Sequence, residues 1–493
     1  MSELAASRPP SGLERWFRFG QNGTTLARDT IAGMTTFIVM SYIIFVNPSI
    51  LSFRGVPDLQ GKGLPFEAVL TSTCLVAGVM TILMGLYSNR AYAIAPGLGL
   101  NAVVAFTLVA EAGLSFPEAM GLIVVEGLAA VIAVLIGLRE SIMRAIPLEL
   151  KKAIAIGIGL FIAFIGLYNS GLVIGRASPT PVDLATFTTW PVIITLVGLI
   201  ITIALRAIGF PGDLLIGIVA TTVFATIVNY AADVYPENLG YARWPDDIFK
   251  APDFSLVGEI SFDAFTTIPF VAALAFAFSL FLADFFDTMG TLVGVGRQAG
   301  YLDQRGELPE IRKPLLVDSA AAAAGGFVSA SSATTYIESA SGVGVGGRTG
   351  WVSVITGALF FPFMFVAPLI GMVPPQATAP ALIIVGWLMI SVLTEAEELA
   401  EPAEAGDEPR QRRALAGIDF HDVALGLSAA IVIMFMPFSF SITDGIAAGF
   451  IVYVLVRTCQ RQWNQVHPLM WAAALAFAIY FAIPIMQQEF SWI

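Results

Sequence analysis

The sequence carries unusually little charge. Charged residues make up only 13% of the 493 residues, whereas apolar residues make up 57%. A water-soluble domain needs roughly a quarter of its residues charged. The composition, with a mean hydropathy of +0.80, therefore predicts an integral membrane protein embedded in a lipid bilayer. The net charge of −12 argues against nucleic acid as a partner, because binding phosphates requires a basic patch.

Cysteine and histidine are also scarce. Cys74 and Cys459 lie far apart and form neither a CxxC pair nor a zinc-binding spacing. With His421 and His467 as the only histidines, haem, a binuclear metal centre and a histidine proton relay are excluded. We expect no metal and no cofactor. The N-terminal segment is polar and lacks a small-residue cleavage site, so we interpret it as cytoplasmic rather than as a signal peptide.

Fourteen apolar segments are long enough to be candidate membrane spans, given that a spanning helix needs about 20 apolar residues. They lie near residues 30–51, 67–88, 93–110, 118–138, 150–172, 190–206, 212–232, 266–296, 315–332, 334–347, 349–372, 376–396, 420–437 and 441–457. A further apolar stretch, 468–485, either spans the membrane or lies at its surface, and the sequence leaves this open.

The distribution of Lys and Arg predicts the orientation of these spans. With the N-terminus inside, the fourteen-span arrangement places 20 of the 25 basic residues in the cytoplasm and five outside, as the positive-inside rule requires. We therefore expect a multi-pass protein of the plasma (inner) membrane with a cytoplasmic N-terminus. The acidic loop 231–263 is then external, and the Glu-, Ala- and Pro-rich loop 395–413 is cytoplasmic and disordered.

Two of the segments are interrupted at matching positions in the two halves of the chain. Seven spans in each half predict an inverted repeat, and paired interrupted spans are typical of transporter binding sites. The first interrupted segment is APGLGLNA, residues 95–102, where Pro96, Gly97 and Gly99 cannot sustain a helix. Main-chain groups freed there must be buried in protein or line a cavity. The alternative is a tight turn outside the hydrocarbon. Asn101 offers both a donor and an acceptor to a polar ring.

The second interrupted segment, residues 334–350, contains Glu338 in an otherwise uncharged run from Ser319 to Gly347. A carboxylate at that depth costs several kcal/mol unless it is paired or hydrogen-bonded, so it marks a functional site. In the eighth span, Asp284 and Asp287 are three residues apart and share one helix face. Two nearby acids in a low dielectric cannot both ionise freely, so one of them can exchange a proton.

The other polar features of these spans receive structural interpretations. Gly290 and Gly294 form an edge of small residues where we expect another helix to approach closely. Glu126 is expected to make a structural hydrogen bond. Asp318 and Asp444 lie at expected span starts, where a carboxylate interacts favourably with the helix dipole.

Several motifs together resemble the AzgA-like purine permeases, a branch of the nucleobase:cation symporters related to the uracil and xanthine permeases. The motifs are residues 32–37 (AGMTTF), 42–48 (YIIFVNP), 95–102 (APGLGLNA), 157–161 (GIGLF), 286–292 (FDTMGTL), 334–339 (TTYIES) and 383–386 (IIVG). The resemblance covers about residues 28–458. It implies an all-α polytopic fold of fourteen transmembrane segments in two inverted repeats of seven, with strand-like breaks in segments 3 and 10.

The resemblance also implies a division into a core domain and a gate domain. The cytoplasmic segment 1–29 precedes core segments 30–138 and 266–372, and gate segments 139–232 and 373–458. The external loop 233–265 separates the repeats, and 459–493 is a C-terminal tail. The expected substrate-binding residues are Asp287, Glu338, Asn101, Thr335, Ile337, Gly99 and Thr36, and the coupling proton is assigned to Asp284, Asp287 or Glu338. Related permeases commonly form homodimers.

The sequence therefore predicts a transporter, and no enzyme, that imports adenine, guanine or hypoxanthine by symport with a proton, or alternatively with sodium. The main alternative is a transporter of the same fold for another substrate, either xanthine or uracil or an inorganic anion such as sulfate. The acidic character of the interrupted segments argues against an anion. An intramembrane aspartyl protease would need its two aspartates on separate helices, and a channel would need repeated pore motifs.

Overall fold

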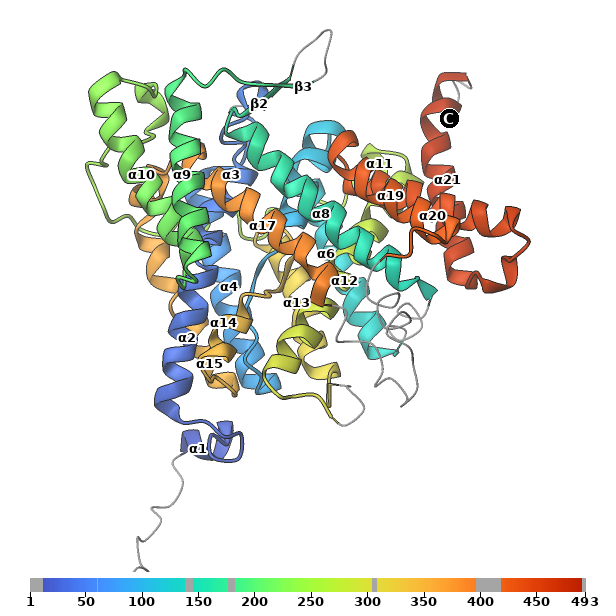
Figure 1. Ribbon diagram of the computed structural model, residues 1–493, viewed down its shortest axis with the longest axis horizontal. Coiled ribbons are helices and arrows are strands. Elements are labelled where there is room, and N and C mark those ends of the chain that lie inside the picture. Colours follow the sequence, from blue (N-terminus) through green and yellow to red (C-terminus); the bar gives the residue numbers. More distant parts are fainter. Residues whose placement is uncertain are drawn as a thin grey trace, which may run out of the picture.

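Helices account for most of the chain because long apolar runs must satisfy their backbone hydrogen bonds internally. The computed structural model describes residues 12–59, 61–137, 145–175, 182–303, 308–395 and 418–489. Figure 1 shows the resulting bundle, in which the short N-terminal helix α1 (Gly12–Phe17) lies at one end of the molecule.

Among the described residues, the first half of the chain contains seven longer helices and one interrupted segment. The longer helices are α2 (Leu26–Met40), α3 (Ile43–Leu51), α4 (Phe66–Ser88), α6 (Phe116–Leu135), α8 (Leu148–Asn169), α9 (Trp190–Ala207) and α10 (Asp213–Ala232). The interrupted segment consists of strand β1 (Ile94–Pro96), helix α5 (Leu98–Ala102) and the π-helical η2 (Val103–Glu111). A hairpin of β2 (Val173–Gly175) and β3 (Val182–Leu184) follows α8, and the 3₁₀ turns η1 (Pro57–Leu59) and η3 (Glu237–Leu239) lie in loops.

The second half begins with the short α11 (Ala264–Thr267) and has its own interrupted segment, strand β4 (Ala333–Thr335) followed by α14 (Ser339–Gly344). Its other elements are α12 (Phe270–Gln298), α13 (Arg312–Phe327), α15 (Gly350–Ala358), η4 (Phe361–Phe365), α16 (Ala367–Gly371), α17 (Pro375–Glu395), α19 (Val423–Ser439) and α20 (Ile442–Cys459). The turn η6 (Trp463–Gln465) and the helix α21 (Pro468–Glu489) close the chain.

These elements confirm the predicted breaks and leave the number of spans a prediction. Within the described residues, eight helices are long and apolar enough to cross a membrane, and several shorter apolar helices accompany them. Both interrupted segments contain a strand where a helix breaks. The stretch 468–485 lies within a helix. The loop expected to be disordered at 395–413 falls outside the described residues from position 396 onward.

Contacts between helices recur in pairs across the two halves. In one set, α4 packs on α15 while α6 packs on α13. In another, α8 packs on α19 while α17 packs on α9, and α8 also packs on α17. Each contact joins a helix of the first half to a helix of the second half, and each of the two sets contains a contact and its equivalent with the two halves exchanged. Two repeats that interlock would produce this pattern.

The crossing of α4 and α15 depends on two glycines. A Cβ atom on Gly85 would lie 2.2 Å from the carbonyl oxygen of Gly350. The backbones of the two helices are therefore in direct contact, which only residues without a side chain permit.

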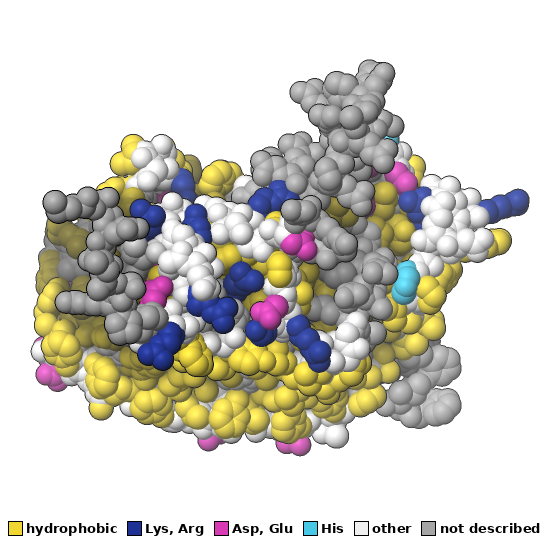
Figure 2. All heavy atoms as spheres, turned by 90° about the horizontal axis from the view of Figure 1, so that it is seen from below, with side chains coloured by type: hydrophobic (Ala, Val, Ile, Leu, Met, Phe, Trp, Pro, Cys, Tyr) yellow, Lys and Arg dark blue, Asp and Glu magenta, His cyan; other side chains and the backbone are white. Residues whose placement is uncertain are grey.

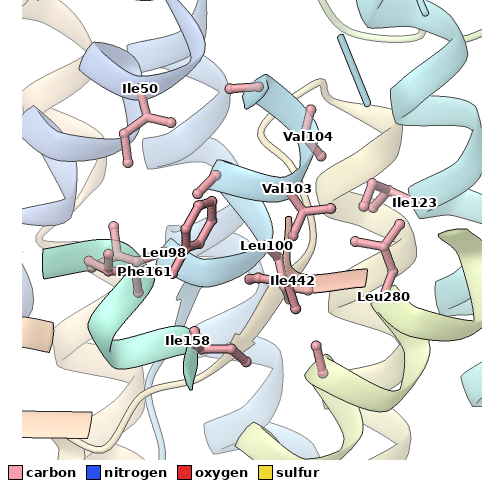
Figure 3. Close-up of a cluster of buried hydrophobic side chains, with 14 of the residues drawn as sticks. Ile50, Leu98, Leu100, Val103, Val104, Ile123, Ile158, Phe161, Leu280 and Ile442 are labelled. Atoms are coloured by element: carbon pink, nitrogen blue, oxygen red, sulfur yellow. The ribbon is translucent and has the colours of Figure 1, made fainter. Parts of the chain in front are cut away.

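Apolar side chains fill the region where α5 and η2 meet α8 and α20 (Figure 3). Leu98 and Leu100 lie against Ile158, Phe161 and Ile442, and all five side chains are buried. The face of the molecule on the side of α1 has a different character, because Lys and Arg side chains gather on it (Figure 2). A face rich in cations is what the predicted cytoplasmic side requires.

Candidate functional site

The two interrupted segments meet in the centre of the molecule as an antiparallel pair. Strand β1 pairs with β4 in the register Ile94–Thr335, Ala95–Thr334 and Pro96–Ala333. Two further backbone hydrogen bonds extend the pair, from Gly97 N to the Ser332 carbonyl (2.8 Å) and from Tyr336 N to the Ala93 carbonyl (2.9 Å). Main-chain groups freed by the helix breaks are thus satisfied by hydrogen bonds between the two interrupted segments.

Asp318 on α13 is the best-connected carboxylate at this pair. Its Oδ1 accepts hydrogen bonds from Thr335 N (2.8 Å) and Thr335 Oγ1 (2.6 Å), and its Oδ2 accepts one from Thr288 Oγ1 (2.5 Å). The side chain is buried, with 1% of its surface exposed. Asp318 therefore links β4 and α12 to α13. The sequence predicted only a favourable interaction with the helix dipole, which does not account for these hydrogen bonds.

The sequence understates Asp318 because α13 begins at Arg312, before the expected span start at 315. The residue consequently lies in the second turn rather than at the helix end. The two hydroxyl groups that bind it are distant in sequence: Thr335 lies 17 residues after Asp318, and Thr288 lies 30 residues before it. The only sequence feature that could have indicated this role of Asp318 is the presence of the threonines, and their spacing forms no recognisable motif.

Glu338 lies directly after the strand–helix break, where it precedes the first residue of α14. Its side chain is half-buried, and its Oε1 accepts a hydrogen bond of 2.6 Å from the hydroxyl of Tyr42. Tyr42 is buried and precedes α3, in the YIIFVNP motif. The sequence identified the glutamate but gave Tyr42 no role.

Asp287 projects from α12 next to these groups. It lies within electrostatic reach of Asp318 and Glu338. The side chain is half-buried, and no hydrogen bond to it occurs among the described residues. Three carboxylates from α12, α13 and the start of α14 thus surround the β1–β4 pair, and Asp287 is the one whose oxygens remain open to a ligand.

Asn101 is completely buried on α5, one turn beyond Gly97. Neither its amide nitrogen nor its amide oxygen has a hydrogen-bond partner within the described part of the chain. Buried polar groups are almost always hydrogen-bonded, and one that is not requires an explanation such as a missing ligand or water. The amide is therefore a candidate ligand contact.

The remaining predicted binding residues differ in how they are placed. The hydroxyl proton of Thr335 is committed to Asp318, so this hydroxyl can only accept from a ligand. Ile337 is 37% exposed and lies beside Gly294 of α12. Gly99 packs against Ile158 of α8. Thr36 is buried against Gly342 of α14, with its hydroxyl unsatisfied among the described residues.

Asp284 and Asp287 both lie near Asp318, but on different sides of α12. Asp284 lies on the buried side of α12, 3% exposed, at a small cavity that Asp318 and Ser319 also line. The acids within electrostatic reach of Asp287 are Asp318 and Glu338. A spacing of three residues turns the second side chain by about 60° from the first, and here this difference separates the core side of α12 from its open side.

The glycines of α12 contradict the expected close helix approach. A Cβ atom on Gly290 would meet no atom within 4 Å, and one on Gly294 would meet only Ile337 at 3.7 Å. Gly290 is exposed and Gly294 half-buried. Asp287, Gly290 and Gly294 define this open face of α12. The helix α14 packs on α12, and the ammonium of Lys151 on α8 is 5.9 Å from the ring centre of Phe286.

Two other intramembrane acids have the structural roles expected. Glu126 on α6 accepts a long hydrogen bond (3.4 Å) from Ser332, which precedes β4. Asp444 lies in the first turn of α20, and its Oδ1 accepts a hydrogen bond from Tyr480 of α21 (3.1 Å). Both carboxylates therefore join neighbouring elements.

Comparison with known proteins relates the chain to permeases. A model of the permease family Xan_ur_permease matches residues 28–398. The adenine permease AdeQ of Escherichia coli is 37% identical over 95% of this chain and 95% of its own length. The guanine/hypoxanthine permease PbuG of Bacillus subtilis is 35% identical over 95% and 99%, respectively. The resemblance to purine permeases is thereby confirmed.

Solved structures share the fold at low sequence identity. The transmembrane domain of the cyanobacterial bicarbonate transporter BicA superposes with a TM-score of 0.56 at 16% identity, over 86% of this chain and 97% of that one. The murine anion transporter Slc26a9 gives a TM-score of 0.59 at 13% identity, over 93% and 74%. The chain thus has a mostly helical membrane-transporter fold that resembles the inverted-repeat fold of these proteins.

Proposed function

Since the chain belongs to the Xan_ur_permease family of permeases, whose members are transporters and not enzymes, we propose that it imports purine nucleobases by symport with protons. The proposed substrates are adenine, guanine and hypoxanthine, the compounds in the names of its relatives. The observation that carries the proposal is the group of three carboxylates, Asp287, Asp318 and Glu338, around a strand pair in an apolar helical bundle.

The chemistry of these groups suits the edge of a purine. Ring N–H and amino groups of the base are donors, and the carboxylates of Asp287 and Glu338 accept from them. Ring nitrogens and carbonyl groups are acceptors, and the unsatisfied amide of Asn101 supplies a donor. Gly99, Thr335, Ile337 and Thr36 remain proposed contacts, with Ile337 lining the open face of α12.

Proton coupling would use the carboxylate that is least committed to the protein. Asp318 already accepts several hydrogen bonds and Glu338 accepts one from Tyr42. Asp287, by contrast, is half-buried and accepts no hydrogen bond among the described residues. We therefore assign the coupling proton to Asp287 ahead of Asp284 and Glu338. Sodium in place of the proton is the alternative that an uptake experiment distinguishes.

Alternating access would result from motion of a core domain, 30–138 with 266–372, against a gate domain, 139–232 with 373–458. The contacts support this division, because α4, α6, α13 and α15 pack with one another and α8, α9, α10, α17, α19 and α20 do the same. The chain is a polytopic membrane protein of a permease family. We further propose the plasma membrane, a cytoplasmic N-terminus and a homodimer.

Uptake of radiolabelled adenine, guanine and hypoxanthine by cells that lack their own purine permeases tests the proposal. Asp287→Asn should abolish saturable uptake although the protein still inserts, whereas Glu310→Gln, on an exposed acid, should have no effect. Glu338→Gln should weaken binding by about 1.5–3 kcal/mol, the contribution of a hydrogen bond to a charged group. Unchanged uptake by Asp287→Asn would remove the proposed role.

An uptake assay at fixed membrane potential, with the pH gradient and the sodium gradient varied separately, identifies the coupling ion. If protons drive uptake, accumulation of the base should increase with the pH gradient and should not depend on the sodium gradient. Competition by excess sulfate, xanthine or uracil separates the alternative substrates, since a purine-specific site is indifferent to sulfate.

A further inference from the structure

A large cavity lies away from the carboxylates. It has a volume of about 760 Å³ and lies at the end of α8, bordered by the starts of α9 and α17 and by the β2–β3 hairpin. Asn169 lines this cavity, whereas Lys151, which approaches Phe286 next to Asp287, lies near the other end of α8. The two positions are 18 residues apart, which corresponds to roughly 27 Å of helix.

An apolar barrier separates the two regions. The ring of Phe440 contacts the rings of Phe106, Phe161, Phe164 and Tyr168, at centroid distances of 5.4–6.3 Å. Leu98 and Leu100 of α5 also pack on α8, which carries Phe161, and on α20 (Figure 3). Tyr168 belongs both to this group of rings and to the cavity wall. The cavity is therefore outside the barrier, on the side that the orientation of the spans predicts to be external.

The described residues that line the cavity are mainly apolar, and the polar ones among them are uncharged. None of the described lining residues is Asp, Glu, Lys or Arg, and three are tyrosines: Tyr168, Tyr235 and Tyr241. An inorganic anion or an organic cation requires an opposite charge or a bare helix end. A flat, neutral and polar ring requires aromatic surface and a few amide groups instead.

Two amides supply those contacts. Asn169 is 8% exposed, and its Oδ1 has no hydrogen-bond partner within the described residues. The hydroxyl of Tyr235 donates to Gln376 Oε1 (3.0 Å), which fixes this amide and leaves its N–H groups to donate. One unsatisfied acceptor and one oriented donor complement the edge of a heterocycle that presents both N–H and ring-nitrogen groups.

We propose that this cavity is a second binding site, which takes an uncharged purine base before the base reaches the carboxylates. The ligand class rests on the proposed function. The N–H of the base donates to Oδ1 of Asn169 after this side chain has turned its enclosed oxygen toward the cavity. The amide of Gln376 donates to a ring nitrogen or carbonyl, and the tyrosines flank the ring. A site outside the apolar barrier collects the base while the inner site is closed to it.

Equilibrium binding to the purified full-length chain tests the second site, with radiolabelled adenine, guanine and hypoxanthine used in turn. The wild type should bind more base per chain than either Asn169→Leu or Asp287→Asn, and each variant should retain the component that the other loses. The double variant should bind none. Gln376→Leu should weaken the component that Asn169→Leu removes by roughly two- to tenfold, as expected for loss of a hydrogen bond between uncharged groups.

A thermal melt separates a binding defect from a folding defect. Asn169→Leu removes an amide whose oxygen is unsatisfied, so the base-free protein should melt no lower than the wild type. The matched control is Asn229 of α10, whose amide is fully used: it accepts from Tyr235 N and donates to the carbonyls of Tyr241 and Ala242. Asn229→Leu should lower the melting temperature.

The outcomes distinguish the two proposals. Equal binding by Asn169→Leu and the wild type, or complete loss of binding in Asp287→Asn, would overturn the second site and leave the carboxylate site standing. Full binding by Asp287→Asn together with complete loss in Asn169→Leu would remove the carboxylate site and keep the cavity. No binding of any base by the wild type would overturn both.

Discussion

The hydroxyl of Tyr42 donates a hydrogen bond of 2.6 Å to Oε1 of Glu338, although the two residues are 296 positions apart in the chain. Tyr42 begins the second part of an interrupted first span, and Glu338 follows the strand of the second interrupted segment. The bond therefore connects the two halves of the chain at the carboxylates, and it fixes one oxygen of Glu338.

Replacing Tyr42 by Phe should weaken base binding without unfolding the protein. The substitution keeps the buried ring and removes only the hydroxyl, so Glu338 loses the bond that orients it. A hydrogen bond to a charged group contributes about 1.5–3 kcal/mol, which corresponds to roughly ten- to a hundredfold in the dissociation constant. Binding of radiolabelled adenine to the purified protein measures the change. Tyr87→Phe, on a half-exposed tyrosine of α4, is the control, and equal affinities for the two variants would contradict the role of Tyr42.

Asp318→Asn and Asp287→Asn should fail in different ways. Asp318 accepts from Thr288 and from both donors of Thr335, so an amide there leaves buried donors unsatisfied and should lower the free energy of unfolding by at least ~2 kcal/mol. Asp287 has no such partners among the described residues, and its substitution should abolish uptake at nearly unchanged melting temperature. Thermal melting and uptake, measured on both variants, decide the matter. A stable Asp318→Asn protein would show that the hydrogen bonds contribute little.

Gly290 and Gly85 should respond oppositely to alanine. A Cβ atom at Gly290 meets open space, whereas one at Gly85 lies 2.2 Å from the Gly350 carbonyl oxygen. Gly290→Ala should therefore retain uptake and stability, while Gly85→Ala should cost about 1–3 kcal/mol of stability through overpacking.

Phenylalanine at position 290 should block the open face of α12 beside Asp287 and stop uptake while the fold remains intact. Uptake rates and melting temperatures of the three variants provide the readout. Normal uptake by Gly290→Phe would show that the base does not pass along this face.

Phe440→Ala should open the apolar barrier from the outer side. Removing the ring leaves a gap among Phe106, Phe161 and Tyr168, through which water can reach Thr107, whose hydroxyl contacts the Phe440 carbonyl. A cysteine at position 107, in a protein with Cys459→Ser, should react with an impermeant thiol reagent added outside only when Phe440 is alanine. Phe440→Leu, which keeps apolar bulk, should restore protection, and equal labelling of all variants would refute the barrier.

The amino-acid sequence alone determined the membrane-embedded class, the broken segments around Gly97 and Glu338 and the candidate acids Asp287 and Glu338. These are local properties: hydrophobic length decides whether a helix can span, proline and glycine decide where it breaks, and a carboxylate in an apolar run stands out against its neighbours.

Tertiary structure decided how those pieces combine. The pairing of Ile94 with Thr335, the hydrogen bonds that make Asp318 a hub and the open side of Gly290 all depend on segments that are distant in sequence. The sequence alone does not show whether a glycine allows another helix to approach closely or borders open space. An aspartate likewise does not reveal which hydroxyl groups will surround it, because those partners are selected only when the two halves of the chain pack together.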